Sequence, residues 1–229
     1  MPDRYPAIED HAVIGDLRTV ALVAAYGTID WCCLPRFDSP AAFASLLDAD
    51  CGGCFAVRSG AVRTRQLYKP GTNVLVTRFL GVGSVGEVVD FMVPRHPGSR
   101  PAHPGPLLVR RLRAVRGTVV FTITCRPAFD FGRQDPPCTR LATVARCSPP
   151  PGAQAGLVLR ASQRFSVAGP AATATVTLGP GQGLDLLVEW GGRPEPPAEG
   201  EADRLEEQSI QQANMICFGI AQCASLAAA

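Results

Sequence analysis

Short apolar segments, each bounded by glycine or proline, are the feature that most limits the folds open to this chain. The 229 residues include 23 Gly and 21 Pro, and no long helical pattern occurs before residue 200. Segments of about five to ten β-branched and apolar residues recur between turn signals, which is typical of a sandwich or barrel. We therefore predict an all-β fold, a two-sheet antiparallel sandwich with a C-terminal helix.

The recurrence predicts twelve strands. In chain order they are Val20–Ala25, Thr28–Leu34, Cys54–Arg58, Arg63–Tyr68, Val74–Leu80, Glu87–Val93, Leu107–Ala114, Thr118–Arg126, Thr139–Cys147, Gly156–Val167, Ala172–Leu178 and Leu184–Trp190. One short helix is expected early, where Ser39 and Pro40 precede AAFASLLDAD, because serine caps a helix and proline suits its first position.

The composition changes after residue 190, which divides the chain into a sandwich domain (1–190), a linker (191–203) rich in proline, glycine and acidic residues, and a C-terminal helix (204–229). One face of that helix is apolar at helical spacing; it carries Ala213, Ile216, Ile220, Cys223 and Ala224. Because an apolar stripe needs a surface to pack on, we expect the helix to contact the sandwich or a partner chain, including a second copy.

Charge and targeting signals exclude several partners. The net charge is +2, which predicts no strong attraction to nucleic acid. No run of 18 apolar residues occurs, so no membrane span is expected. The N-terminus lacks the basic start and apolar core of a signal peptide. Without an export signal, nine cysteines, an odd number, favour free thiols and a cytoplasmic location.

Polar residues are densest between Ile8 and Leu47. Three acidic residues and one histidine there could supply acid–base catalysis: His11, Asp16, Asp30 and Asp38. Arg18, Trp31 and Arg36 could bind a ligand beside them. The structural alternative is a set of buried ion pairs and turn caps. No phosphate-binding loop, dinucleotide fingerprint or nucleophile elbow is present, so no cofactor is predicted.

Two cysteine motifs have functional and structural interpretations. Cys51-Gly52-Gly53-Cys54 could be a zinc half-site or a redox pair. Its glycines precede a predicted strand, which favours a hairpin turn. No second ligand pair follows, so no metal site is predicted. Cys33 could be a nucleophile with His11 as its base, whereas a small core residue is the structural reading.

Four arginines between residues 110 and 116 form a basic cluster: Arg110, Arg111, Arg113 and Arg116. No aromatic residues alternate with them, so base stacking is not indicated. We predict that they lie on a solvated sheet face.

The dense stretch also carries a family resemblance. YPAIEDHAVIGDLRTVALVAAYGTIDWCCLPRFDSPAAFASLLD resembles the start of bacterial proteins of glycoside hydrolase family 15, the glucoamylase and trehalase-like enzymes. YKPGTNVLVTRF, GEVVDFMVPR, LVRRLRAVRG and RPAFDFGR follow in the family's order, so the resemblance covers about residues 4–190. It differs at Cys32, usually an apolar residue, and at Cys51 and Cys54, usually polar.

The resemblance implies the N-terminal super-β-sandwich domain of that family. The family's two catalytic glutamates lie on loops of an (α/α)6 barrel that follows this domain, and no residue of this chain is assigned to either role. The C-terminal helix resembles the linker helix that leads to the barrel. The IGD-R-T and DW-C-PRFDS segments are expected to support the barrel.

Two functions remain open at this stage. The first is a non-catalytic module that packs against a barrel or binds a partner or glycan. The alternative is a free-standing, cofactor-independent enzyme, with acid–base or cyclisation chemistry on a small molecule in a biosynthetic pathway. That alternative would use His11, Asp16, Asp30 and Asp38, with Trp31 as an apolar wall.

Overall fold

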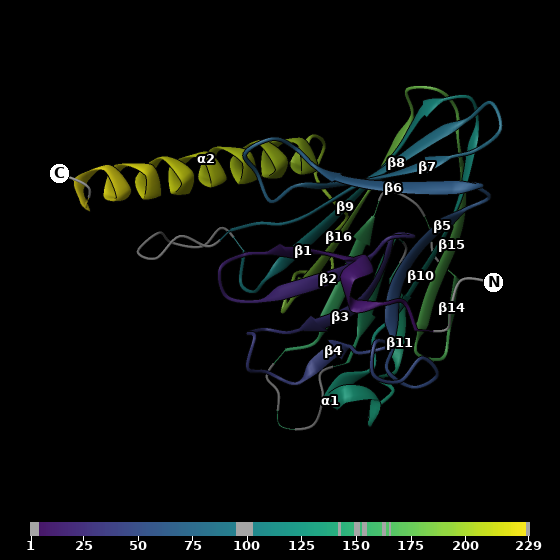
Figure 1. Cartoon of the computed structure of the whole chain (residues 1–229). Coiled ribbons are helices and arrows are strands. Elements are labelled where there is room, and N and C mark those ends of the chain that lie inside the picture. Colours follow the sequence, from purple (N-terminus) through teal and green to yellow (C-terminus); the bar gives the residue numbers. More distant parts are fainter. Residues whose placement is uncertain are drawn as a thin grey trace.

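The computed structural model describes residues 5–94, 103–141, 143–148, 152, 155–161, 164 and 166–227, with side chains of the last helix described up to Asn214. Two antiparallel sheets face each other, and a long helix lies across one of them (Figure 1). The predicted all-β sandwich with a C-terminal helix is confirmed.

The first sheet has the strand order β1-β2-β3-β5-β10-β15-β14, and β4 pairs with β3. Its strands are β1 (His11–Gly15), β2 (Val20–Ala24), β3 (Thr28–Cys33), β4 (Ala41–Phe43), β5 (Cys54–Ser59), β10 (Val119–Arg126), β14 (Ser166–Ala168) and β15 (Ala171–Leu178). A short 3-10 turn, η1 (Ile8–Asp10), precedes β1.

The second sheet has the strand order β11-β12-β13-β16-β9-β8-β7-β6. Its strands are β6 (Arg63–Tyr68), β7 (Leu75–Leu80), β8 (Val85–Met92), β9 (Leu107–Arg116), β11 (Cys138–Leu141), β12 (Val144–Cys147), β13 (Leu157–Ala161) and β16 (Gly183–Trp190). A single turn, α1 (Phe129–Gly132), follows β10.

Alternate residues of both sheets fill the space between them, which is the main core. Phe43, Phe55 and Phe121 come from the first sheet, and Met92 and Leu112 come from the second. The other face of the second sheet carries a smaller apolar cluster that includes Phe91 and Val109, and Ala202 and Leu205 of the last helix pack against it. The helix is therefore part of the folded body.

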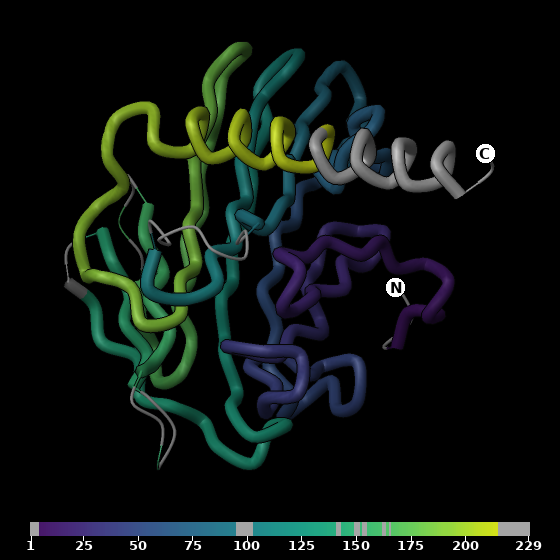
Figure 2. Tube along the Cα trace, turned by 90° about the vertical axis from the view of Figure 1, so that its left-hand side faces the viewer, coloured from purple at the N-terminus to yellow at the C-terminus, as the bar shows by residue number. Residues whose placement is uncertain are grey.

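That helix, α2 (Glu201–Ala227), begins three residues before the predicted start at residue 204. The chain leaves β16, follows the loop 191–200 and enters α2 (Figure 2). Of the predicted apolar stripe, only the side chain of Ala213 lies within the described part; those of Ile216, Ile220, Cys223 and Ala224 lie outside it.

The short helix predicted after Ser39 is wrong. Ala41–Phe43 forms β4, because Cys32 and Cys33 of β3 pair with Phe43 and Ala41. All three residues of β4 are buried, so tertiary packing outweighs a local capping signal. The predicted strands 139–147 and 156–167 are each two strands, separated by residues that are partly outside the described set.

The arginine cluster is also not a solvated face. Arg110 is fully buried between the sheets, and Arg111 is 5% exposed beneath α2. Only Arg113 and Arg116 are exposed. Successive residues of a strand point to opposite faces. At residues 110 and 111 both faces of β9 are covered, one by the first sheet and one by α2, whereas the end of the strand from residue 113 is partly exposed.

The prediction of free thiols needs one correction. Cys138 and Cys147 form a disulfide across β11 and β12, because they are direct cross-strand partners. Cys32, Cys33, Cys51, Cys54 and Cys125 are free. Gly52 and Gly53 of the CxxC lead directly into β5, as predicted from the sequence.

Candidate docking site

The turn between β1 and β2 is held by its own side chains. Asp16 Oδ1 accepts hydrogen bonds from the backbone N–H groups of Arg18 (3.0 Å) and Thr19 (2.8 Å). The Asp16 N–H donates to the Thr19 carbonyl at 3.2 Å. Asp16, a candidate catalytic residue, is fully buried and stabilises this turn.

The loop after β3 is bonded to the same turn. The Phe37 N–H donates to the Arg18 carbonyl at 2.9 Å, and Thr19 Oγ1 donates to the Cys33 carbonyl at 2.5 Å. The Arg36 N–H donates to Ser39 Oγ at 3.1 Å, which closes the loop locally. Two segments distant in the sequence thus form one rigid corner.

This corner exposes apolar side chains. Leu17 is 66% exposed and Phe37 is 65% exposed. Leu17 has a φ of 72°, a left-handed conformation that costs a residue other than glycine about 1–2 kcal/mol. We call Leu17, Arg18, Arg36, Phe37 and Asp38 the docking rim. Its aromatic, aliphatic and arginine side chains are those enriched in protein interfaces.

Arg36 and Asp38 form an exposed pair on the rim. Arg36 Nε and Nη2 donate to the two carboxylate oxygens of Asp38 at 2.8 and 3.0 Å. The hydrogen bonds from Arg36 lower the pKa of Asp38 and so favour its ionised form. Both side chains are 69% exposed, so the pair orients the loop rather than stabilising it.

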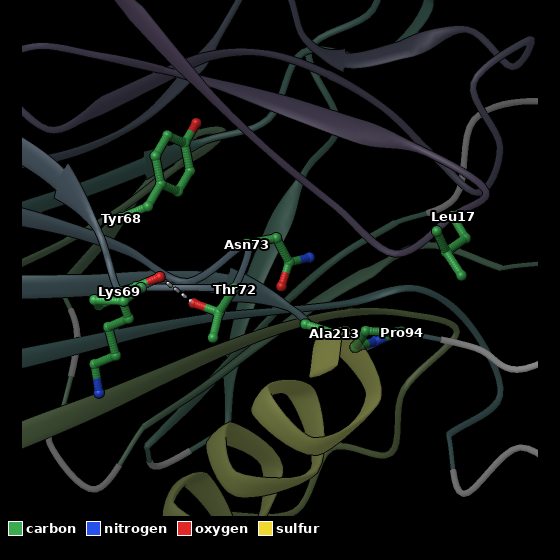
Figure 3. A pocket seen from close by; sticks show the side chains of 9 residues that line it. Leu17, Tyr68, Lys69, Thr72, Asn73, Pro94 and Ala213 are labelled. Atoms are coloured by element: carbon green, nitrogen blue, oxygen red, sulfur yellow. Dashed lines mark hydrogen bonds between the residues drawn. The ribbon is translucent and has the colours of Figure 1, made fainter. Parts of the chain in front are cut away.

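A groove of about 490 Å³ adjoins the rim at Leu17. We call it the docking groove; it is lined by Leu17, Tyr68, Lys69, Pro70, Gly71, Thr72, Asn73, Pro94 and Ala213. Figure 3 shows Asn73 between Tyr68 and Leu17, with Ala213 of α2 opposite. The groove therefore joins four parts of the chain: the β1–β2 turn, the end of β6 with the β6–β7 connection, the segment after β8 and α2.

Hydrogen bonds hold the walls of the groove. Asn73 Nδ2 donates to the Gly15 carbonyl at 2.8 Å. The Tyr68 hydroxyl accepts the Val13 N–H and donates to the Val13 carbonyl, both at 2.8 Å. Lys69 forms an ion pair with Glu206 of α2. The groove is preformed, as small-molecule and side-chain receptors usually are.

Helix α2 is fixed to the second sheet by arginines. Arg111 donates to Asp185 of β16 (2.9 Å) and to Asp203 (2.6 Å) and Glu206 (2.5 Å) of α2. Burial opposes the charge of Arg111, but these hydrogen bonds outweigh it and raise its pKa. Arg160 of β13 holds the first residue of the helix, Glu201, through two hydrogen bonds at 2.8 and 3.2 Å.

The structure also brings together His11 and Asp30. His11 Nε2 lies 2.8 Å from Asp30 Oδ2, and the two side chains are 1% and 4% exposed. Burial raises the pKa of Asp30, and the hydrogen bond to His11 opposes that shift. His11 Nδ1 is 2.9 Å from the Ala7 carbonyl. The pair ties the N-terminal segment to β3.

The remaining candidates lie in different places. Trp31 is half-buried and its ring lies 6.1 Å from that of Phe131. Arg18 is exposed on the docking rim. The four proposed catalytic residues do not converge: His11 and Asp30 form a pair, Asp16 caps a turn and Asp38 is paired with Arg36. Neither the docking groove nor a second pocket, which Glu189 and Glu201 help to line, is lined by any of the four.

Sequence reasoning missed Leu17, Phe37 and the groove. The signal was present in GDLR and RFDS, where a large apolar residue stands among turn-forming polar residues. Among the described residues, no group of three or more His, Cys, Asp or Glu side chains is placed to hold a metal ion. Within the same residues, no helix combines the length and apolarity needed to cross a bilayer.

The fold and this site define a class of protein: a two-sheet β-sandwich with a helix docked on one sheet and an exposed apolar rim beside it. The sequence matches the family described as "Trehalase-like, N-terminal" over residues 2–189. The chain belongs to this family of trehalase-like N-terminal domains.

Proteins named trehalase are similar to it. The trehalase of Mycolicibacterium smegmatis is 30% identical over 227 residues, covering 90% of this chain and 34% of the relative. That of Mycobacterium tuberculosis is 28% identical, with 86% and 32% covered. That of Thermoplasma volcanium is 39% identical over 136 residues, with 58% and 21% covered. The chain thus spans about a third or less of the length of these relatives.

Proposed function

We propose that this chain is a non-catalytic N-terminal module that packs, through the docking rim and docking groove, against a trehalase-type catalytic domain. The observation that carries the proposal is the exposure of Leu17 and Phe37 on a corner that hydrogen bonds hold rigid. A rigid corner with exposed large apolar side chains loses little conformational entropy on binding. Strain kept at an exposed residue is a pointer to function.

The position of α2 supports the same proposal. Its first turns are fixed to the second sheet by Arg111 and Arg160, and Ala213 further along lines the docking groove. A helix held in this way directs the chain toward the rim side of the sandwich. In this proposal α2 sets the direction in which a following domain begins.

The binding roles within the site are assigned as follows. Arg18 and Arg36 contact polar groups of the catalytic domain around the apolar anchors Leu17 and Phe37.

The proposed module needs no cofactor for this packing role. We propose a cytoplasmic location. The five cysteines that are free in the described part of the chain support it, whereas the Cys138–Cys147 disulfide argues against it.

The first test is an assay of the purified chain for glucose release from trehalose and maltose. No turnover is expected, because all four candidate residues make structural contacts and only His11 and Asp30 lie together, while Asp16 and Asp38 lie elsewhere. Turnover by the chain alone, lost in His11→Ala with folding intact, would refute the proposal and favour the free-standing enzyme.

The second test measures docking directly. The part of the M. smegmatis trehalase that follows its matching segment is mixed with this chain, and association is followed by sedimentation. We expect a complex that Leu17→Ser and Phe37→Ser each weaken about tenfold or more, as for apolar anchors at an interface centre. Arg63→Ala, an exposed change on β6, is the matched control and should leave association unchanged. Equal association of all variants would place the interface elsewhere.

A further inference from the structure

A second pocket, of about 430 Å³, lies at the N-terminal end of α2. We call it the polar pocket; it is lined by His103, Pro104, Arg160, Glu189, Gly191, Arg193, Glu195 and Glu201. These residues come from β13, β16, the loop after β16, the start of α2 and the segment before β9. The volume is within the range of about 300–1,000 Å³ that is typical of small-molecule sites.

Two charged side chains at this pocket are buried and incompletely satisfied. The side chain of Glu189 is 4% exposed and that of Arg160 is 9% exposed. Glu189 Oε1 and Arg160 Nε each have no hydrogen bond among the described residues. His103 Nδ1 lies 3.5 Å from Glu189 Oε1. A buried carboxylate oxygen without a donor costs stability, and such groups in native proteins call for an explanation.

The remaining charges limit what could supply the donor. Arg160 donates two hydrogen bonds to Glu201, at 2.8 and 3.2 Å, and its Nη2 lies 3.7 Å from Glu189 Oε2, not from Oε1. Three carboxylates line the pocket against two guanidinium groups, which disfavours an anion. The exposed Arg193 at the pocket disfavours a polyvalent cation. Hydroxyl groups satisfy both demands, because each can donate to a carboxylate and accept from a guanidinium.

We propose that the polar pocket binds a neutral, polyhydroxylated small molecule, a mono- or disaccharide or a similar polyol, through Glu189, Arg193 and Glu195. Binding is non-covalent and involves no reaction. The site is formed by the second sheet and the start of α2, and it shares no lining residue with the docking groove. It therefore does not depend on the proposed docking function.

The test is an NMR titration of the ¹⁵N-labelled chain with trehalose and with glucose. We expect saturable shifts of the Gly191, Glu195 and Glu201 amides, with the amides of the docking rim unmoved. Glu195→Gln and Arg193→Ala should each weaken binding about tenfold or more, the loss expected for a hydrogen bond to a charged group. Both side chains are exposed, so neither change threatens the fold.

Arg116→Ala, an exposed change at the far end of β9, is the matched control and should bind like the parent chain. Glu189→Gln, checked for folding by its own spectrum, should also weaken binding. The proposal is overturned if neither sugar gives saturable shifts at the pocket, or if Glu195→Gln and Arg193→Ala bind as the parent does. It is equally overturned if spermidine or citrate saturates the site and the sugars do not.

Discussion

The interior of the sandwich contains a buried ion pair, whereas the docking rim exposes large apolar side chains to solvent. Inside, Arg110 and Asp90 form an ion pair whose side chains are both 0% exposed. At the rim, Leu17 and Phe37 are about two-thirds exposed. A charge in the core and a large apolar side chain in water are both unfavourable by themselves. They differ in whether their surroundings compensate for them.

The buried pair is fully compensated. Arg110 donates to Asp90 (2.8 and 3.2 Å), to the Phe55 carbonyl and to the Gly27 carbonyl (both 2.6 Å). Its guanidinium carbon also lies 4.7 Å from the centre of the Phe55 ring. Arg110 belongs to β9 of the second sheet, whereas Phe55 belongs to β5 of the first sheet and Gly27 to the turn between β2 and β3. Arg110 therefore ties the two sheets together. Among the described residues, Leu17 and Phe37 of the rim stay about two-thirds exposed, and the proposed docking is what would bury them.

Breaking the interior pair should give the largest effect. Asp90→Ala leaves the Arg110 charge buried without its partner, so we expect a loss of about 3–5 kcal/mol in the free energy of unfolding. Urea denaturation followed by fluorescence of the two tryptophans measures it. Arg63→Ala, exposed on β6, should change stability by less than about 0.5 kcal/mol. Similar values for the two variants would mean that the interior pair contributes no more than a surface residue.

The next effect concerns the attachment of α2. Arg111→Met keeps the aliphatic stem but leaves Asp185, Asp203 and Glu206 without their shared donor. We expect a loss of about 2 kcal/mol, confined to the helix. Hydrogen exchange of the α2 amides should accelerate about thirtyfold, while those of β8 and β16 stay protected. Arg113→Met is the control. The Arg113 side chain is 46% exposed, and its contact with Asp203 is long, at 3.7 Å, so its loss should matter little. Acceleration throughout the sheets would show that the helix and the sandwich unfold as one unit.

Protonation of Glu201 and Glu206 at low pH should weaken the attachment of α2 to the second sheet, with a smaller effect than Arg111→Met. Burial alone would raise the pKa values of Glu201 and Glu206, but hydrogen bonds from Arg160 to the first, and from Lys69 and Arg111 to the second, hold both values low. Their stabilisation is present above the unfolded-state pKa of about 4.3 and is lost as the pH falls through the lower folded-state values. Amide shifts of residues 202–210 should therefore change below about pH 4.

Arg160→Met is the matched variant for the acid titration. Without Arg160 the pKa of Glu201 loses its main opposing interaction, so the transition at the start of α2 should move to higher pH. An unchanged transition would mean that Glu201 does not control the release of the helix.

The same contrast explains what the sequence could and could not predict. The alternation of apolar residues predicted most strands, because a buried sheet face imposes a period of two. The alternation could not predict that Arg110 is buried, because an arginine on a strand usually indicates a solvent-exposed position. Its burial depends on Asp90, Gly27 and Phe55, which come from three other segments of the chain. Ser39 and Pro40 favoured a helix locally, and the long-range pairing with β3 prevailed. The rim and groove depend on contacts between residues far apart in the sequence, such as Phe37 with Arg18.

The smallest effect on stability is also the sharpest test of the rim. Leu17→Gly removes the left-handed strain of about 1–2 kcal/mol, while added freedom of the unfolded chain costs about 0.5–1 kcal/mol. The variant should therefore lie between about equal in stability to the parent and about 1.5 kcal/mol more stable in urea denaturation. A residue that can be removed at no cost to the fold, yet whose loss weakens docking, is retained for the partner. If Leu17→Gly instead destabilises the chain by more than about 1 kcal/mol, Leu17 is a structural residue and the contrast with Arg110 fails.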